Sequence, residues 1–141
     1  MSAGYISLIR FPQVTSNFVG VACHIYGLSQ IEITRKFKIE EINIINIPEM
    51  IADFVVLESK ETSEFFAVCC FQNSSVVKIY SLLSQSLVYE VESDYLGEVG
   101  VGGYMPKLEI TFFDGKYILA LIIQAEFPDD KNTLKLFELK L

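Results

Sequence analysis

The sequence of 141 residues has no tryptophan, one histidine and three cysteines, and its 11 basic residues are outnumbered by 18 acidic residues. The shortage of Lys and Arg leaves a formal charge of −7, which argues against a broad nucleic-acid-binding surface, because phosphate binding depends on clustered positive charge. An odd cysteine count without regular spacing does not fit a secreted disulfide framework. We therefore expect no direct contact with nucleic acid and an intracellular location, in the cytoplasm or the nucleus.

A membrane-spanning run and a secretion signal are also missing. The longest uncharged stretch, Phe11–Ile31, has the length of a membrane helix, but Pro12 and several amide and hydroxyl side chains make it too polar. Met1–Ile9 is of mixed character and is followed by Arg10, so it does not have the pattern of a signal peptide. We expect no membrane association.

The residues that are present favour an ordered, all-β chain. Apolar residues make up 51% of the sequence and aromatic residues 13%, which is enough to bury a core. Asp114-Gly115 predicts a two-residue hairpin, and only Ile47–Ala52 could form a helical turn. Short segments rich in Ile, Val, Phe and Tyr predict eleven strands, namely Tyr5–Phe11, Val19–Tyr26, Ile31–Ile39, Ile42–Ile47, Asp53–Glu58, Phe65–Phe71, Val76–Leu82, Leu87–Val91, Leu108–Phe113, Tyr117–Ile123 and Leu134–Leu139.

Two internal similarities indicate a repeated unit. Val19–Thr34 aligns with Phe65–Tyr80 at a shift of 46 positions, which places Cys23 on Cys69. The middle of the chain aligns with its last third at a shift of 52 positions, and the strand that follows aligns at 57, with Lys135 on Lys78. A period of about 50 residues that contains four short strands is the spacing of β-propeller blades.

Counting strands in fours divides the single β domain, 1–141, into blade-like units of residues 5–47, 53–91 and 108–139, the last without its fourth strand. A lone four-stranded blade exposes apolar residues on both faces, and only stacking on its neighbours buries them. Phe65–Phe71 and Tyr117–Ile123 are continuously apolar, as expected of strands buried on both sides. We predict a partial or degenerate β-propeller of about three four-stranded blades.

The third strand of the second and third units resembles the third strand of WD-repeat β-propellers. In Asn73–Leu82 and Asn132–Leu139 a turn residue and a Ser or Thr precede an apolar, basic, apolar, aromatic, polar, apolar run. Tyr80 and Phe137 stand where that family usually has Trp, and a Gly-His pair before a first strand is absent. The resemblance implies a degenerate propeller that serves as a scaffold. Phe66–Tyr89 is also similar to a late blade of the non-catalytic WD-repeat subunit of eukaryotic tRNA guanine-7 methyltransferase.

The sequence contains no residue constellation for catalysis. Cys23-His24 and Cys69-Cys70 fall on equivalent strands, but adjacent strand residues point to opposite faces and zinc-type Cys spacing is absent, so we expect no metal site. His24 lacks both a nucleophile-elbow Ser and a placed Cys. Gly97–Gly103 precedes neither Gly-Lys-Ser/Thr nor a helix start, so it is not a phosphate loop. We predict that the chain is not an enzyme and has no cofactor.

Two loops are candidates for partner binding, because recognition residues are usually placed on loops that a rigid β scaffold holds. One loop flanks the glycine-rich stretch with aromatic and Met side chains that are common in interfaces. The other supplies carboxylates that suit a basic partner. The candidate residues are Tyr95, Tyr104, Met105, Glu126, Asp129 and Asp130.

We therefore predict a non-catalytic scaffold or interaction module that acts within a multiprotein complex or a larger propeller. Because propellers usually have four to eight blades, we expect other protein subunits as partners, in a homo- or hetero-oligomer. The open edge of the third unit could also be covered by Tyr5–Phe11, which would close the ring. The alternatives are an accessory WD-repeat-like subunit of a tRNA-modifying methyltransferase and a closed eleven-stranded barrel or sandwich that binds an apolar ligand.

Overall fold

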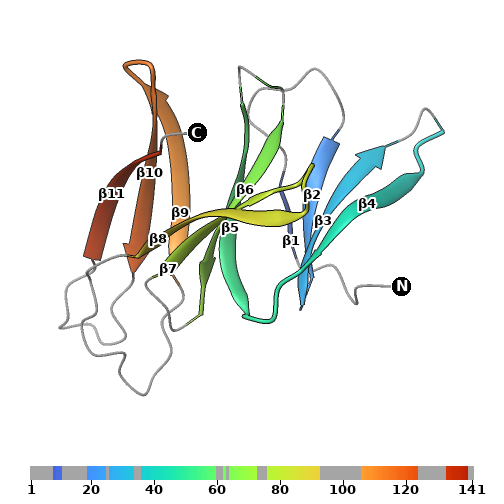
Figure 1. Ribbon diagram of the computed structural model, residues 1–141, viewed down its shortest axis with the longest axis horizontal. Coiled ribbons are helices and arrows are strands. Elements are labelled where there is room, and N and C mark those ends of the chain that lie inside the picture. Colours follow the sequence, from blue (N-terminus) through green and yellow to red (C-terminus); the bar gives the residue numbers. More distant parts are fainter. Residues whose placement is uncertain are drawn as a thin grey trace.

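Strands alone make up the regular secondary structure of the residues that the computed structural model describes, namely 8–10, 19–24, 26–33, 36–59, 62, 64–72, 76–92, 106–123 and 133–139. The predicted all-β class with eleven strands is confirmed (Figure 1). In this part of the chain there is no helix that could span a bilayer. The strands are β1 (Leu8–Arg10), β2 (Val19–His24), β3 (Gly27–Ile33), β4 (Ile39–Asn46), β5 (Ile51–Glu58), β6 (Phe65–Phe71), β7 (Val76–Ser81), β8 (Ser86–Glu92), β9 (Lys107–Phe113), β10 (Lys116–Ile123) and β11 (Thr133–Leu139).

The strands form three antiparallel sheets in which each strand pairs with its neighbours in the sequence. The first sheet has the order β1-β2-β3-β4, the second β5-β6-β7-β8 and the third β9-β10-β11. Figure 1 shows the second sheet between the first and the third. Among the described residues no strand pairs with a strand of another sheet, so the alternative of a closed eleven-stranded barrel is wrong, whereas the arrangement of sheets packed face to face does not exclude a sandwich. A closed barrel covers only the inner face of its sheet. A strand that is apolar on both faces therefore needs a second sheet packed against each face.

One strand prediction in the first half of the chain is wrong. The segment Ile31–Ile39 is not one strand, because β3 ends at Ile33 and a turn that includes Phe37, with φ 57°, leads into β4. The early start of β3 depends on Gly27, which pairs with both His24 and Asn46. The helical turn that Ile47–Ala52 could have formed is absent: residues 47–50 have no regular structure and β5 begins at Ile51, in keeping with the limit that Pro48 sets on a helix there.

The suggestion that Tyr5–Phe11 closes a ring is wrong for its described part. Residues 8–10 form β1, which pairs antiparallel with β2 and so belongs to the first sheet. Ile9, at the centre of β1, lies opposite Ala22. These three residues therefore do not supply the missing strand of the third sheet.

The Asp114-Gly115 hairpin is confirmed. Phe113 pairs with Lys116, so the loop between β9 and β10 has two residues, with φ 51° at Asp114 and 72° at Gly115. Two consecutive positive φ angles define a type I′ turn, whose twist matches that of the flanking strands.

Two apolar cores lie between the three sheets, and β6 contributes to both. Alternate residues of β6 point to opposite faces, so Ala67 and Cys69 face the first sheet while Val68 and Cys70 face the third. The core between the first and second sheets contains Val21, Cys23, Leu28, Ile45, Ile47, Phe54, Val56, Ala67, Cys69, Phe71, Tyr80 and Leu82. The core between the second and third sheets contains Leu57, Val68, Cys70, Val77, Ile79, Leu108, Ile110, Leu119, Leu121 and Leu139.

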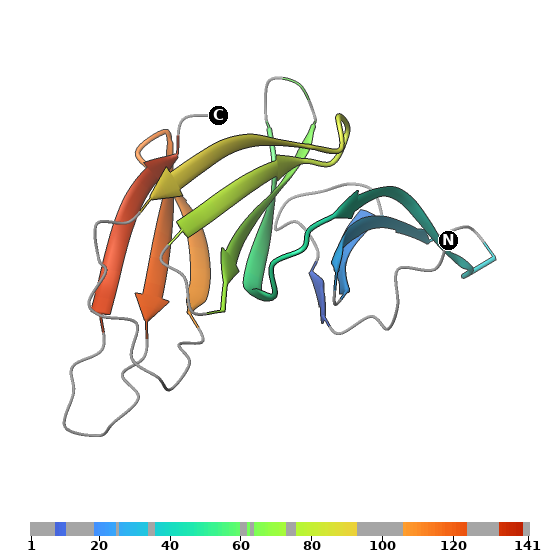
Figure 2. The same ribbon diagram turned by 60° about the horizontal axis from the view of Figure 1, so that its bottom comes forward.

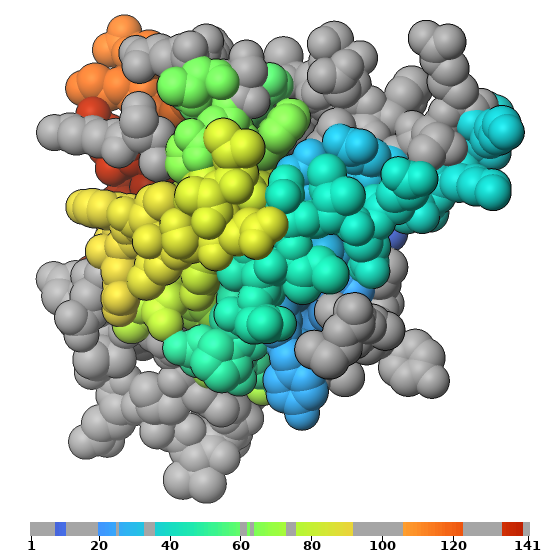
Figure 3. Space-filling view, turned by 45° about the vertical axis from the view of Figure 1, so that its right-hand side comes forward, coloured from blue at the N-terminus to red at the C-terminus, as the bar shows by residue number. Residues whose placement is uncertain are grey.

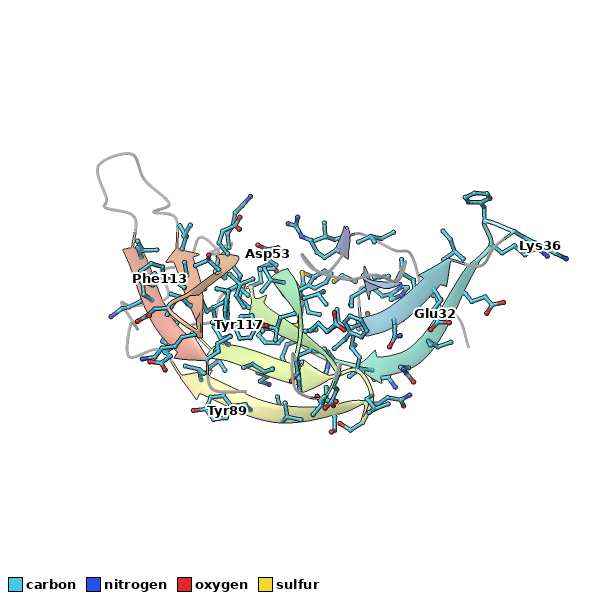
Figure 4. The ribbon with its side chains drawn as sticks, turned by 90° about the horizontal axis from the view of Figure 1, so that it is seen from above. Glu32, Lys36, Asp53, Tyr89, Phe113 and Tyr117 are labelled. Carbon is cyan, nitrogen blue, oxygen red and sulfur yellow. The ribbon has the colours of Figure 1, made fainter. Side chains whose placement is uncertain are left out.

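The inner strands β1, β5 and β9 lie close together, and the sheets diverge towards their outer strands (Figures 2 and 4). At the outer side, the first and second sheets still meet, because Gln85 Nε2 donates a 3.0 Å hydrogen bond to Oδ1 of Asn43. Figure 3 shows residues of β4 and β8 side by side on this surface. The stack is thus joined at its inner strands and, between the first two sheets, also at the outer side.

The alignment of Cys23 with Cys69 does not describe equivalent positions. Cys23 points from the first sheet towards the second, whereas Cys69 points from the second sheet back towards the first, so both lie in the same core. Residues in equivalent positions would both point to the following sheet, as Cys23 and Cys70 do. The shift of 46 is therefore wrong, because moving a strand by one position turns every side chain to the other face.

Candidate interaction surface

The face of the third sheet that points away from the second sheet carries a line of apolar residues along β10 and β11. Leu134 and Leu136 on β11 are 60% and 65% exposed, and Phe113, at the hairpin end of the same face, is 72% exposed. Contiguous exposed apolar side chains mark binding surfaces, because leaving them in water is unfavourable. Strand alternation and the register of the sheet place six residues together as what we call the outer patch: Phe113, Ile118, Ala120, Ile122, Leu134 and Leu136.

The equivalent face of the second sheet is covered by the third sheet, and its residues can be compared with those of the outer patch. Lys78 pairs with Cys69 and Lys135 pairs with Leu121, so β7 and β11 hold matching positions beside β6 and β10. The residues that flank Lys78 are Val77 and Ile79, both fully buried by the third sheet, and those that flank Lys135 are Leu134 and Leu136. The prediction that Tyr117–Ile123 is buried on both sides is wrong for the outer side, where Ile118 and Ile122 are only partly buried.

Charged side chains surround the outer patch in equal numbers. Lys107, Glu109, Lys116 and Glu138 lie on the same face of the third sheet. Lys116 Nζ and Glu138 Oε1 are 3.7 Å apart, and both side chains are well exposed, so this ion pair contributes little stability. The face is close to neutral although the chain carries a charge of −7. An apolar centre with a polar rim is the anatomy of a protein interface.

The outer edge of the third sheet also differs from the outer edges of the other two. β4 and β8 each contain a register shift where they pair with the neighbouring strand, whereas β10 and β11 pair without interruption from Tyr117 and Leu139 to Ile123 and Thr133. Bulges at edge strands hinder pairing with further strands. Among the described residues β11 pairs only with β10, so it is a regular strand with one side of its backbone open.

Asp53 is a buried carboxylate that connects the inner strands of all three sheets. Its Oδ1 accepts a hydrogen bond from the backbone N–H of Phe54 at 2.9 Å, and its Oδ2 accepts one from the N–H of Leu108 at 3.0 Å. Arg10 on β1 approaches Oδ1 at 3.4 Å. Figure 4 shows Asp53 between the first and third sheets. A buried carboxylate with these partners is structurally satisfied and is not a candidate acid or base.

The three thiols are buried, and two of them have raised pKa values. Burial raises the pKa of Cys69 well above its ordinary value and that of Cys70 to about 12. The Cys70 thiol donates to the carbonyl oxygens of Asp53 at 3.5 Å and Pro106 at 3.4 Å. A neutral, buried thiol is a poor nucleophile and a poor metal ligand. The described residues contain no group of three His, Cys, Asp or Glu side chains that could hold a metal ion.

His24, Ser29 and Glu41 form a polar cluster on the face of the first sheet that points away from the second. His24 Nε2 lies 3.0 Å from Ser29 Oγ and 2.8 Å from Glu41 Oε1, and Ser29 Oγ donates to the same carboxylate oxygen at 3.0 Å. A carboxylate can only accept, so Nε2 carries the proton. Nε2 therefore has no free lone pair with which to accept a proton from Ser29. In a catalytic triad, one ring nitrogen of the histidine accepts the proton of the nucleophile, and the other nitrogen donates a hydrogen bond to the carboxylate.

All six predicted partner-binding residues, Tyr95, Tyr104, Met105, Glu126, Asp129 and Asp130, lie outside the described residues, as does Gly97–Gly103. The outer patch, Asp53 and the His24 cluster were missed by the sequence reasoning. Alternation along Leu134–Leu139 places Leu134 and Leu136 on one face of the strand, but the sequence gives no signal that this face is exposed. Comparison with protein-family models and with curated proteins finds no match.

Proposed function

We propose that this chain is a non-catalytic scaffold or interaction module, built from blade-like sheets of a degenerate WD-like propeller, that acts within a multiprotein complex or a larger propeller. The observation that carries the proposal is the contrast between Val77 and Ile79, which are fully buried, and the matching Leu134 and Leu136, which are largely exposed. The face of the second sheet that carries Val77 and Ile79 packs against the third sheet, whereas the equivalent face of the third sheet, which carries Leu134 and Leu136, is exposed. Protein partners that present an apolar β-sheet are the expected occupants.

The buried polar groups support a role without catalysis. The His24 cluster lacks the hydrogen-bond arrangement of a nucleophile and its base, and Asp53 is occupied by backbone N–H groups. Both sets satisfy buried polar atoms, which is their structural use.

Partner capture with matched variants tests the proposal. Wild-type chain, the double variant Leu134→Asp/Leu136→Asp and the control Phe37→Asp/Leu83→Asp are used to capture proteins from cells of the source, and the captured sets are quantified by mass spectrometry. Phe37 and Leu83 are 88% and 72% exposed and lie in the connections between β3 and β4 and between β7 and β8, so the control removes comparable apolar surface elsewhere. We expect the outer-patch variant to lose partners that the control retains. Equal capture by both variants would contradict the proposal.

A further inference from the structure

We propose that the open edge of β11 binds an extended segment of a partner protein, which adds the fourth strand to the third sheet. This inference rests on the proposed function and specifies the chemistry of the partner. In the first two sheets the outer place is filled by β4 and β8, and in the third the described residues leave it empty. Addition of a strand to an open edge is a common mode of peptide recognition, in which the backbone provides affinity and side chains provide specificity.

The second sheet gives the register of the added strand. β8 lies antiparallel to β7, with Val91 opposite Val77, Glu90 opposite Lys78 and Tyr89 opposite Ile79. Because Lys135 holds the place of Lys78 beside the neighbouring strand, Leu134 and Leu136 hold the places of Val77 and Ile79. A strand added to β11 in the same way therefore faces Leu136, Lys135 and Leu134 in that order.

The register defines which side chains the partner needs. The residues opposite Leu134 and Leu136 join the outer patch, so they must be apolar or aromatic, as Val91 and Tyr89 are. The residue between them lies opposite Lys135 on the other face, where an acidic side chain gives a favourable cross-strand pair. The partner segment is thus an extended apolar-acidic-apolar run that lies antiparallel to β11.

The regularity of β11 supports this choice of occupant. Both existing outer strands carry a bulge, near Asn43 in β4 and at Val88 in β8, and such bulges limit pairing with another strand. β11 pairs over its whole length without a shift, as interior strands β6 and β7 do with each other. Its place in the sheet is that of β7, which has a strand on each side.

A peptide with the sequence of residues 84–92 of this chain, capped at both ends and labelled with a fluorophore, is a direct probe. We expect saturable binding to the full chain by fluorescence anisotropy, and binding at least about tenfold weaker when Tyr89 and Glu90 of the peptide are interchanged, because a carboxylate then meets the outer patch. Leu136→Asp in the chain should abolish binding, while Leu83→Asp should leave it unchanged. Absence of saturable binding at about 1 mM peptide would overturn the inference.

Charge reversal distinguishes binding in a specific register from nonspecific apolar association. Lys135→Glu in the chain should weaken binding of the peptide. Glu90→Lys in the peptide should restore binding to that variant and weaken binding to the wild type. Lys36→Glu, at a distant turn, is the matched control and should change nothing. Equal affinities in all combinations would overturn the proposed register.

The site of binding and the occupant are checked separately. A photo-crosslinker at the Val91 position of the peptide should label residues 133–139, and labelling of residues 76–81 would mean that the peptide replaces β8, which overturns the inference. Dimers of the chain that Leu136→Asp abolishes, without peptide binding, would make a second copy the occupant and would also overturn it. If the peptide does not bind but the Leu134→Asp/Leu136→Asp chain still captures fewer partners than the control variant, only strand addition is wrong. If this variant captures the same partners as the control, the proposed function is wrong.

Discussion

The backbone N–H of Leu108 donates a 3.0 Å hydrogen bond to Oδ2 of Asp53, so a buried carboxylate of the second sheet binds the backbone near the start of β9 in the third sheet. The other oxygen of Asp53 binds the N–H of Phe54 and lies 3.4 Å from Arg10 of the first sheet. One side chain therefore connects three strands that are far apart in sequence. Charge-assisted hydrogen bonds to buried groups are among the stronger polar contributions to stability.

Replacing Asp53 tests how much this connection stabilises the stack. Asp53→Ala leaves two backbone N–H groups without acceptors and should lower the free energy of unfolding by about 2–4 kcal/mol. Asp53→Asn keeps the shape but turns one oxygen into a donor that faces an N–H group, so it should also be clearly destabilising. Urea denaturation followed by circular dichroism measures both. Glu40→Ala, an exposed position on β4, is the control, and an equal effect there would refute the role given to Asp53.

The geometry of the His24 cluster predicts that Ser29 is inert. A fluorophosphonate probe should leave Ser29 unlabelled in the native chain, because Nε2 of His24 carries a proton and cannot act as its base. Ser29→Ala should lower the free energy of unfolding by only about 1 kcal/mol, since the direct 2.8 Å contact between His24 and Glu41 remains. Peptide mapping of the probe-treated chain provides the measurement, and stoichiometric labelling of Ser29 would contradict a non-catalytic cluster.

The raised pKa values of the buried thiols predict a loss of stability in alkaline solution. The pKa of Cys70 rises from 9.0 to about 12 on folding, and that of Cys69 also rises, so the folded chain holds these protons more tightly than the unfolded chain. The resulting stability is complete below about pH 9 and decreases as the pH rises towards 12, by up to about 1.4 kcal/mol per pH unit for each thiol. Urea denaturation between pH 8 and 11 measures the slope.

A variant separates the thiols from other alkaline effects. Burial also raises the pKa of Tyr80, so this phenol adds to the same trend above its ordinary value of 10.0. Cys70→Ala should make the pH slope shallower while lowering the stability at pH 7. A slope identical to that of the wild type would show that the Cys70 thiol does not titrate as described.

Substitution of Gly27 and Gly115 by Ala should lower the stability by different amounts. A Cβ on Gly27 would overlap the carbonyl oxygen of Ile45 on the neighbouring strand, so Gly27→Ala should strongly destabilise the first sheet. A Cβ on Gly115 would meet no atom within 4 Å, and only its φ of 72° opposes a side chain, so Gly115→Ala should lower stability by about 1 kcal/mol. Thermal melts of the two variants make the comparison. A larger loss at Gly115 would contradict the close approach at Gly27.

Much of the secondary structure followed from the sequence, because strand propensity and turn residues act locally. Eleven apolar segments became eleven strands, and Asp114-Gly115 formed the expected turn, since both depend on neighbouring residues alone. The errors occurred where a distant residue decides the outcome. β3 begins at Gly27 because the opposite strand approaches there, and the shift of 46 failed because sequence similarity does not reveal which face of a strand Cys23 or Cys69 occupies.

The candidate surface was less predictable than the strands. Leu134 and Leu136 are apolar like Val77 and Ile79, and their sequences give no sign that one pair is covered and the other exposed. The role of Asp53 was equally unpredictable from the sequence, because its partners Leu108 and Arg10 lie 55 and 43 positions away. Exposure and long-range hydrogen bonds depend on how whole sheets stack, and this information is not contained in any one segment.

The sequence by itself thus determined, for the residues that the structure describes, that the fold is all-β, that there are eleven strands, and that they group as four, four and three. These properties result from backbone preferences and from alternation over a few residues. Only the tertiary structure decided that the described strands form three separate sheets, that β1 belongs to the first of them, and that the third has an exposed apolar face and a regular edge strand. The physical reason is that burial is a property of the whole stack of sheets: the same kind of apolar strand lies in the core where a neighbouring sheet covers it and is exposed, like Leu134 and Leu136, where the described residues do not cover it.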